Sequence, residues 1–354
     1  MRIDADSKNL NGDRMREGTL NAAIVGLGWW GRNLVASVQG KSERLRFVRG
    51  VSKEPETVRD FAAQHGIELS TDIADALGDP RVQAVVLATP HSLHTEQVEA
   101  AAAAGKPVFC EKPLALTPAG AARSVAACKR AGVVLGIGYN RRFWPSMREQ
   151  KRLVKSGELG EILHLEGHFS NENSGTGVFS GWRESPQESP GGGMTGTGLH
   201  VLDAFVNIAG PVARAQAQLL VRKSLPAPLD TLSVLFEFES GVSAMLGVVR
   251  ATPRYWRVHA FGARGSAEVV GEAETALVLR LSGEAPKRIS FEPTDTLRLE
   301  LETFADAVAG SAPYPIRTEE MTDTVAAFDA VVRSIASGGW VVPESAGRRP
   351  RPQP

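Results

Sequence analysis

The stretch LNAAIVGLGWWG, Leu20–Gly31, decides the fold of the first part of the chain. Its apolar half predicts a buried strand, and the residues that follow, NLVASV at 33–38, predict the opening of a helix. A GxGxxG turn between a strand and a helix is typical of dinucleotide binding, because a helix N-terminus offers unpaired N–H groups to phosphates. The alternative is a glycine-rich turn without a ligand. We expect nucleotide contacts at Gly26, Gly28, Trp29, Trp30 and Gly31.

The three glycines of this turn have different expected tasks. Gly26 would permit the tight turn, Gly28 would let the backbone approach a pyrophosphate, and Gly31 would let the helix pack closely on the strand. The motif therefore predicts both a local backbone shape and a ligand.

The composition is that of a globular protein without a strong net charge. The 354 residues are 42% hydrophobic and 23% charged, with 40 basic and 40 acidic residues. A neutral chain lacks the electrostatic attraction of proteins that bind nucleic acids or anionic membranes, so we expect neither as a partner. No apolar run reaches the roughly 18 residues that cross a bilayer, and the first residues do not resemble a signal peptide. These features predict a cytoplasmic protein.

Both ends of the chain are expected to be flexible, and no metal site is predicted. Residues 1–19 mix basic and acidic side chains without an apolar core, which indicates a flexible leader. Residues 342–354 are rich in Pro and Arg and indicate a flexible tail. The only two cysteines, Cys110 and Cys128, belong to no CxxC motif or Cys/His cluster, so we expect them in the core.

The end of the second strand, Arg46–Val51, gives a prediction about the coenzyme. A dinucleotide fold that binds NAD usually has Asp or Glu here to accept the ribose hydroxyls. Ser52 and Lys53 follow instead, and a hydroxyl and an ammonium suit a 2′-phosphate. We therefore expect NADP, with NAD possible and a solvated turn lysine as the alternative.

Strands and helices alternate up to about residue 141, which predicts a doubly wound parallel sheet with right-handed crossovers. Thr89-Pro90, Glu111-Lys112-Pro113 and Tyr139-Asn140-Arg141 each follow an apolar strand. Ligands of such sheets lie beyond the carboxyl ends of the strands, where these three stretches meet. We expect a dinucleotide-binding domain at 20–141 and a site at this edge.

Several motifs together resemble the glucose–fructose oxidoreductase / inositol dehydrogenase / rhizopine-catabolism family, Gfo/Idh/MocA. They are GLGWWG at 26–31, ATPHSLH at 88–94, GKPVFCEKPLA at 105–115, YNRRF at 139–143, LVKSGELGEI at 153–162 and GGGMTGTGLHVLDAF at 191–205. The resemblance covers roughly residues 20–340. It implies an α/β fold with an N-terminal Rossmann domain, NAD(P)-dependent oxidoreduction at a hydroxyl of a sugar or cyclitol, and a homodimer or homotetramer. It places further cofactor contacts at Ala88, Thr89, Pro90, His94, Glu111, Lys112 and Asn140.

Lys112 and His200 are the expected catalytic residues. A lysine at a strand end beside a nicotinamide can polarise a substrate oxygen, as the matching lysine does in the family, although an ion pair with Glu111 at a turn is the alternative. The matching histidine commonly relays the proton. Family sequences often have Asp four residues before it, one helical turn away, where this chain has Gly196. That substitution leaves the proton-transfer step open.

Residues 142–341 are expected to form an α+β substrate and oligomerisation domain. From Pro211 to Phe291 strands follow one another without helices, which predicts a large, mostly antiparallel sheet with helices on one face. The polar loop at 171–190 is typical of a segment that covers a pocket. Within this domain we expect substrate contacts at Arg183, Thr197 and Asp203.

The sequence thus predicts an oxidoreductase that transfers a hydride between a nicotinamide and a hydroxyl or carbonyl carbon of a small-molecule polyol. Two alternatives stay open. One is lyase-like or isomerising chemistry with a tightly held nucleotide, and the other is a cofactor-binding protein without catalysis, which Gly196 makes plausible.

Overall fold

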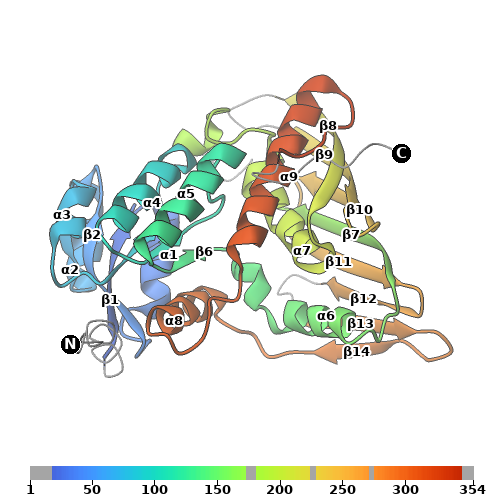
Figure 1. Ribbon diagram of the computed structural model, residues 1–354, viewed down its shortest axis with the longest axis horizontal. Helices are drawn as coiled ribbons and strands as arrows, with labels where there is room; N and C mark the ends of the chain where they lie inside the picture. The colour runs from blue at the N-terminus through green and yellow to red at the C-terminus, as the bar shows by residue number, and fades with distance from the viewer. Residues whose placement is uncertain (1–17, 173–180, 224–228, 271–274, 345–354) are drawn as a thin grey trace, which may run out of the picture.

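A computed structural model describes residues 18–172, 181–223, 229–270 and 275–344, and these residues form two sheet-based units side by side (Figure 1). The first unit is built on a parallel sheet and the second on a larger, mostly antiparallel sheet. The predicted fold class, a doubly wound parallel sheet followed by an α+β unit, is confirmed. The expected flexible leader and tail fall mostly outside the described residues.

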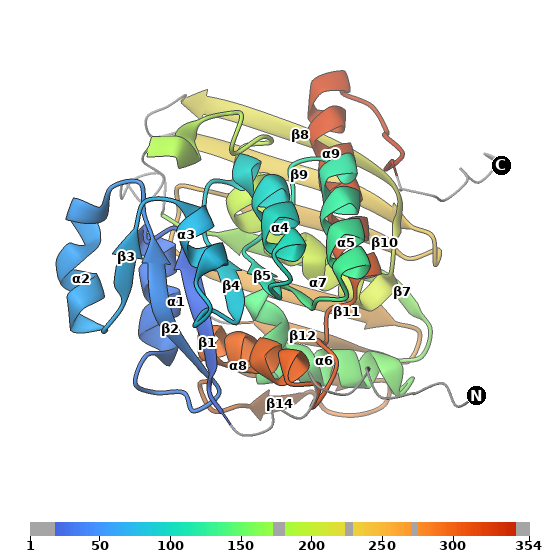
Figure 2. The same cartoon turned by 60° about the vertical axis from the view of Figure 1, so that its left-hand side comes forward.

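In the described residues the first sheet has six strands in the order β3-β2-β1-β4-β5-β6. The chain winds outward from β1 in both directions, so right-handed crossovers place α4 and α5 on one face and α1 on the other (Figure 2). The strands are β1 Leu20–Val25, β2 Leu45–Val51, β3 Glu68–Ser70, β4 Ala84–Leu87, β5 Val108–Cys110 and β6 Leu135–Ile137. The helices are α1 Trp29–Val38, α2 Arg59–Gln64, α3 Ile73–Gly78, α4 His94–Ala103 and α5 Pro118–Ala131.

Local sequence explains most of these boundaries. Helix α5 begins after Thr117, whose hydroxyl accepts a hydrogen bond from the Gly120 N–H at 3.1 Å, and is capped at its C-terminus by Gly132 in the left-handed region. The helix predicted around Asn33 starts earlier, at Trp29. Residues 55–64 are divided between a 3-10 turn at Pro55–Val58 and α2.

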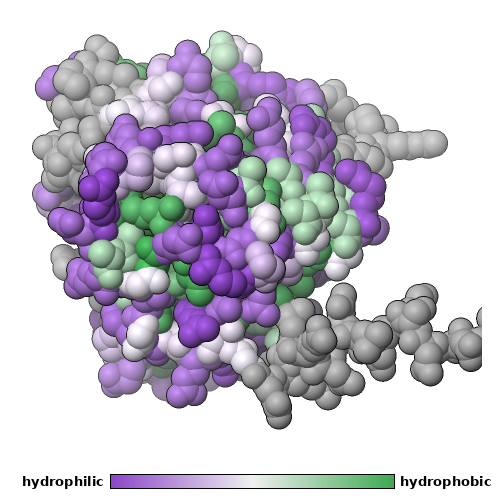
Figure 3. Space-filling model, turned by 90° about the vertical axis from the view of Figure 1, so that its left-hand side faces the viewer, coloured by the Kyte–Doolittle hydropathy of each residue, from purple (hydrophilic) through white to green (hydrophobic). Residues whose placement is uncertain are grey.

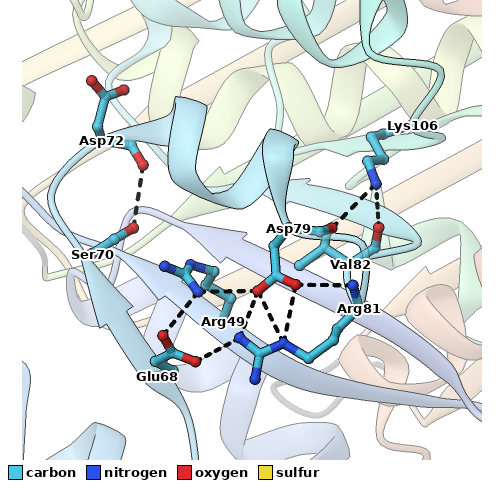
Figure 4. A network of polar contacts seen from close by, with 8 residues as sticks. All are labelled: Arg49, Glu68, Ser70, Asp72, Asp79, Arg81, Val82 and Lys106. Carbon is cyan, nitrogen blue, oxygen red and sulfur yellow. Dashed lines mark hydrogen bonds and ion pairs between the residues drawn. The ribbon is translucent and has the colours of Figure 1, made fainter.

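The edge of the first sheet is held by an ionic network (Figure 4). Arg49 on β2 donates to Glu68 on β3 and to Asp79 after α3, each at 3.0 Å, and Arg81 donates to the same two carboxylates. Arg81 holds the pKa of the Asp79 carboxyl well below its usual range. The network ties the short strand β3 to its neighbour. The surface on this side is mostly hydrophilic, with small apolar patches (Figure 3).

The second sheet has eight strands in the described residues, in the order β14-β13-β12-β11-β7-β10-β9-β8, and only β7 and β10 pair in parallel. Burial alternates along β10, where Ala244, Leu246 and Val248 face the core and Met245 is exposed, as expected of a sheet covered on one face. The strands are β7 Ile162–Ser170, β8 Val212–Lys223, β9 Leu229–Phe238, β10 Ser243–Val249, β11 Tyr255–Gly262, β12 Gly265–Val270, β13 Ala276–Leu281 and β14 Lys287–Ser290.

Helices cover the inner face of this sheet and connect it to the first unit (Figure 1). They are α6 Pro145–Lys155, α7 Leu199–Ala209 and α9 Thr318–Ser337, whereas α8 Thr296–Val308 lies against the first unit. Helix α7 packs closely on β7 at Gly167, where a Cβ would lie 2.2 Å from a Val201 methyl carbon. Helix α9 contacts α5, α7 and β8, and α8 contacts α1, so the last two helices pack against the first unit as well.

Candidate active site

A cavity of about 320 Å³ lies beyond the carboxyl ends of β4, β5 and β6, facing α7. It brings together residues that the sequence distributes over more than two hundred positions. Of the predicted site residues, the cavity is lined by Trp29, Trp30, Ala88, Thr89, His94, Glu111, Lys112, Asn140, Arg183, Thr197 and His200. The structure places the others outside the lining: Gly26, Gly28, Gly31, Ser52, Lys53, Pro90 and Asp203.

The glycine turn has the shape of a phosphate cradle. Gly26 has a φ of +94°, and a Cβ there would lie 2.6 Å from the Ala88 carbonyl oxygen. A Cβ on Gly31 would lie 1.9 Å from the Gly26 oxygen, so both positions require glycine. Gly28 instead faces open space and precedes α1, whose N-terminus has no side-chain cap. Unpaired N–H groups and the open space above Gly28 fit a dinucleotide diphosphate.

Ser52 and Lys53 directly follow β2, where this fold places the adenosine ribose of a dinucleotide. Ser52 is half-buried and its hydroxyl accepts a hydrogen bond from the Glu54 N–H at 3.2 Å, while Lys53 is exposed. These positions are compatible with a 2′-phosphate, and the NADP preference stays a prediction.

Lys112 reaches across the cavity from the end of β5. Its Nζ donates to the Gly196 carbonyl oxygen at 2.9 Å, and its backbone N–H donates to the neighbouring Glu111 carboxyl at 3.3 Å. Burial lowers the pKa of the Lys112 ammonium, and the Glu111 carboxylate opposes that change. Burial likewise raises the pKa of Glu111, which lies at 5% exposure. The pair can therefore change protonation nearer neutral pH than isolated side chains would.

His200 faces the same cavity from the first turn of α7. Its ring centroid lies 6.1 Å from that of Phe169, and within the described residues its Nδ1 has no hydrogen-bond partner. Burial, reinforced by Arg141 and Lys112, holds the pKa of His200 well below its ordinary value. Burial is the larger cause of this shift in the pKa. The lowered pKa favours the neutral imidazole.

The helix predicted to carry both Gly196 and His200 differs from expectation. Met194–Gly198 forms a π-helical turn, and the α-helix α7 begins only at Leu199. The π-turn changes the spacing per turn, so four residues no longer correspond to one turn on the same face. Gly196 lines the cavity through this turn.

His94 holds two cavity loops together. Its Nδ1 lies 2.7 Å from the Pro113 carbonyl oxygen and its Nε2 lies 3.1 Å from that of Thr89. Burial lowers the pKa of its imidazole. The ring thus fixes the loops after β4 and β5 relative to each other, in addition to lining the cavity.

The loop segment 181–190 forms one wall of the cavity. Trp182 packs edge-on against His91 with ring centroids 5.0 Å apart, and the Arg183 guanidinium carbon lies 4.1 Å from the Trp182 ring centroid. The Glu188 carboxylate accepts hydrogen bonds from the Ser92 N–H and hydroxyl. These contacts fasten the loop to the first unit. Residues 173–180 of the predicted loop lie outside the described residues.

Two predicted substrate residues use their polar groups elsewhere. The Thr197 hydroxyl donates to the Gly193 carbonyl oxygen at 2.7 Å, although the residue lines the cavity. Asp203 is at 2% exposure, and its carboxylate accepts hydrogen bonds from the Arg142 guanidinium at 2.7, 2.9 and 3.1 Å. This ion pair favours a structural role for Asp203 over the expected substrate contact.

Other cavity residues were missing from the prediction. Arg141 belongs to the stretch Tyr139-Asn140-Arg141 that was predicted to lie at this edge, although it was not singled out as a contact, and Trp144 follows the YNRRF motif. Phe169 and Arg254 come from β7 and from the connection between β10 and β11, and no local pattern distinguishes them. Only the pairing of strands distant in sequence brings these two to the cavity.

Among the described residues, no group of His, Cys, Asp and Glu side chains is arranged to hold a metal ion. None of the helices in the described parts of the chain combines the length and apolar character needed to cross a membrane.

Comparison with known proteins gives matches over most of the chain. Residues 20–139 match the family described as "Oxidoreductase family, NAD-binding Rossmann fold", and residues 147–272 match the "GFO/IDH/MocA C-terminal domain". Inositol 2-dehydrogenase 2 of Saccharopolyspora erythraea is 30% identical, over 95% of this chain and 97% of that protein. The 1,5-anhydro-D-fructose reductase of Ensifer adhaerens is 26% identical, over 91% and 97%.

Solved structures share the fold. Levoglucosan dehydrogenase in complex with NADH and L-sorbose superposes with a TM-score of 0.83 at 21% identity, over 92% of this chain and 99% of that one.

Proposed function

The chain belongs to the GFO/IDH/MocA family of NAD-binding oxidoreductases that act on CH–OH groups, and from that premise we propose its class of substrate and its catalytic residues. The enzyme transfers a hydride between nicotinamide and a hydroxyl or carbonyl carbon of a sugar, cyclitol or related polyol. The observation that carries this proposal is the position of Lys112, whose ammonium is held 2.9 Å from the Gly196 carbonyl oxygen inside the cavity.

The glycine turn and the loops after β4, β5 and β6 would hold the coenzyme. When bound, a nicotinamide nucleotide supplies the hydride donor or acceptor for the reaction. The open space over Gly28 and the uncapped N-terminus of α1 suit its diphosphate. Ser52 and Lys53 would face a 2′-phosphate, so we propose NADP as the preferred coenzyme.

Lys112 would act on the substrate oxygen. As an ammonium it polarises a carbonyl or stabilises a developing alkoxide, and as a neutral amine it accepts the proton of a hydroxyl. Its lowered pKa makes both forms accessible near neutral pH, and the Gly196 carbonyl fixes the direction of Nζ.

His200 would orient the substrate as a neutral imidazole. The low pKa of His200 disfavours the protonated imidazolium, whereas its position in the cavity allows a hydrogen bond to a substrate hydroxyl. This role does not need a carboxylate partner, which agrees with Gly196.

The outer face of the second sheet is the proposed self-association surface. Leu220, Leu235 and Met245 are exposed on β8, β9 and β10, and such apolar residues on an open sheet favour burial against a second copy. The sedimentation coefficient of Met245→Glu, compared with that of the unchanged protein, tests this expectation of a homodimer or homotetramer.

Lys112→Ala tests the catalytic proposal. We expect turnover to fall roughly 100-fold or more, the effect of removing one acid–base or electrostatic group, while the coenzyme dissociation constant changes little. Coenzyme reduction is measured over a panel of polyols and sugars, and coenzyme binding by tryptophan fluorescence. Lys129→Ala, at an exposed position on α5, is the control. Nearly unchanged turnover in Lys112→Ala would show that this lysine is a structural turn residue.

A further inference from the structure

A second buried carboxyl, that of Glu300 on α8, acts on Glu111 from outside the cavity lining. Glu300 is at 0% exposure, and within the described residues neither of its carboxyl oxygens has a hydrogen-bond partner. The Oε1 atom of Glu111 also has no such partner there. Burying an ionised carboxylate without donors is far more costly than burying the protonated acid. The arrangement therefore points to a carboxyl group that keeps its proton.

The end of β6 brings α8 and Glu111 to the same side of the first sheet. A Cβ on Gly136 would lie 2.9 Å from a ring carbon of Phe304, and a Cβ on Gly138 would lie 2.7 Å from the Glu111 carboxyl carbon. Gly138 continues the pairing of β6, because its N–H donates to a β5 carbonyl oxygen at 2.9 Å. Residues two apart in a strand face one side, and residues four apart in a helix share a face. Glu300, four residues before Phe304, therefore lies on the side of the sheet where the Glu111 carboxyl lies.

The titratable and charged groups around Glu300 favour its protonated form. Burial is the largest cause that raises its pKa and the Glu111 charge is the next, whereas Arg141 in the turn after β6 lowers it and Asp295 before α8 raises it. The net result is a pKa held well above its ordinary value. Tyr314, which follows α8, donates its hydroxyl to a carbonyl oxygen of β6 at 2.8 Å and so directs its proton away from Glu300.

Glu111 differs from Glu300 because it has neighbours that stabilise a negative charge. The Lys112 backbone N–H donates to its Oε2 at 3.3 Å. Burial raises the pKa of Glu111, but the charges of Lys112 and Arg183 oppose that change. One proton on the two carboxyls therefore belongs on Glu300, and the acid O–H of Glu300 is the donor that Oε1 of Glu111 lacks.

We propose that Glu300 keeps its proton and donates it in a hydrogen bond to Glu111, and that it is thereby a positioning residue that holds the Glu111 carboxylate beside Lys112. The inference rests on the proposed function for the role of Lys112 and adds the group that controls its neighbour. The Glu300 proton stays between the two carboxyls throughout the reaction, so the pair neither gains nor loses a proton. Without this donor Glu111 would be a weaker anion, and Lys112 would lose its proton at lower pH.

The first test measures the ionisation of Lys112 in two variants. Glu300→Gln keeps a donor of similar shape, and Glu300→Leu removes it. The ¹³Cε resonance of Lys112 in protein labelled with [¹³C]lysine, identified by its absence in Lys112→Ala, gives the pKa. We expect that pKa to fall by about half a unit or more in Glu300→Leu and to stay within about 0.2 units in Glu300→Gln. The Lys112-dependent limb of the kcat/KM profile should move in the same way.

The second test locates the proton without any turnover and needs only Glu300→Gln. A carboxyl that stays protonated in the folded protein, but ionises at its ordinary pKa when unfolded, stabilises the fold fully at low pH and progressively less as the pH rises. Between about pH 5 and about pH 8, the unfolding equilibrium constant of the unchanged protein should therefore rise relative to that of Glu300→Gln by about tenfold per pH unit, the effect of one proton. Urea unfolding measures both constants.

Glu302→Gln, at a partly exposed position on the same helix, is the matched control and should change neither result. Equal shifts of the Lys112 pKa in Glu300→Gln and Glu300→Leu would overturn the proposal, because the charge of Glu300 would then act on Lys112. An unshifted pKa in Glu300→Leu, or the same pH dependence of unfolding in Glu300→Gln and the unchanged protein, would also overturn it. The expected results without coenzyme reduction on any polyol would support the carboxyl pair and contradict the proposed hydride transfer.

Discussion

Gly196 presents a backbone carbonyl where related sequences often have a carboxylate. That carbonyl accepts the hydrogen bond of the Lys112 ammonium at 2.9 Å, and the residue lines the cavity. Because the residue lines the cavity, we expect a side chain at this position to enter the space beside the reacting groups. On this interpretation the glycine keeps that space open while its carbonyl orients the lysine, and neither effect requires His200 to carry a charge.

Gly196→Asp should lower kcat/KM roughly 10- to 100-fold, because its carboxylate would occupy the substrate space and attract Lys112. The coenzyme dissociation constant should stay within about threefold. Gly196→Ala, which adds volume without charge, should have a smaller effect in the same direction. A Gly196→Asp variant with unchanged kcat/KM would contradict the space-making role, and an upward shift of a His200-dependent pH limb would instead identify a proton relay.

Glu111→Gln should move the lysine-dependent limb of the kcat/KM profile to lower pH. The Glu111 carboxylate stabilises the Lys112 ammonium, so removing that negative charge lowers the pKa of Lys112 further. The fraction of neutral amine at a given pH then increases, and oxidation rises at lower pH than in the unchanged enzyme. The limb should be absent in Lys112→Ala. A limb that moves upward in Glu111→Gln would contradict this electrostatic coupling.

Two of the segments at the cavity contain backbone that departs from regular structure. The strand–turn–helix of β1 and α1 requires glycine at Gly26 and Gly31 because neighbouring carbonyl oxygens occupy the space of a Cβ. The π-turn Met194–Gly198 inserts an irregular turn before α7. Such departures are frequent at functional sites, because they leave backbone N–H and C=O groups directed toward a ligand, whereas a regular helix or strand would hydrogen-bond those groups internally.

The end of β2 carries the coenzyme prediction. Lys53→Ala should weaken NADP(H) binding roughly 10- to 100-fold, the effect of one lost hydrogen bond to a charged group, and leave NAD(H) binding nearly unchanged. Dissociation constants for both coenzymes measure this, with Lys129→Ala as the control. Equal effects on the two coenzymes would contradict an assignment of Lys53 to the 2′-phosphate.

At the scale of the whole molecule, buried polar contacts fix the two units around the cavity. Arg142, in the 3-10 turn Asn140–Phe143 that follows β6, pairs with Asp203 on α7 and lies 3.3 Å from the Glu320 carboxylate on α9. Both members of the Arg142–Asp203 pair are nearly inaccessible to solvent. The contact joins the unit that carries Lys112 to the helix that carries His200.

Asp203→Asn should lower the free energy of unfolding by about 3–5 kcal/mol, because it leaves a buried guanidinium without its main counter-ion. Thermal or urea unfolding measures the loss. Glu56→Gln removes one member of the exposed Arg59–Glu56 pair and should change stability by less than about 1 kcal/mol. If Asp203→Asn lowered the free energy of unfolding as little as Glu56→Gln does, the structural role of Asp203 would be contradicted. A selective loss of substrate affinity in Asp203→Asn would instead support the predicted contact between Asp203 and the substrate.

The sequence by itself determined the elements and much of the cavity floor. The glycine turn, the apolar strands and the residues that follow them at 89, 111–112 and 140 indicated a parallel sheet and its binding edge, because those patterns are local. Helix α9 likewise follows from a local pattern, because apolar residues such as Met321, Val325 and Phe328 recur every three or four positions on its buried face.

Only the tertiary structure decided which distant residues meet these local motifs. Phe169 and Arg254 lie at the cavity because β7 pairs with both β10 and β11. Asp203 does not line the cavity, and its carboxylate is paired with the Arg142 guanidinium. The π-turn and the burial of His200 likewise depend on packing against the second sheet. Burial and the positions of neighbouring charges determine these pKa values and partners, and both depend on contacts that no local pattern specifies.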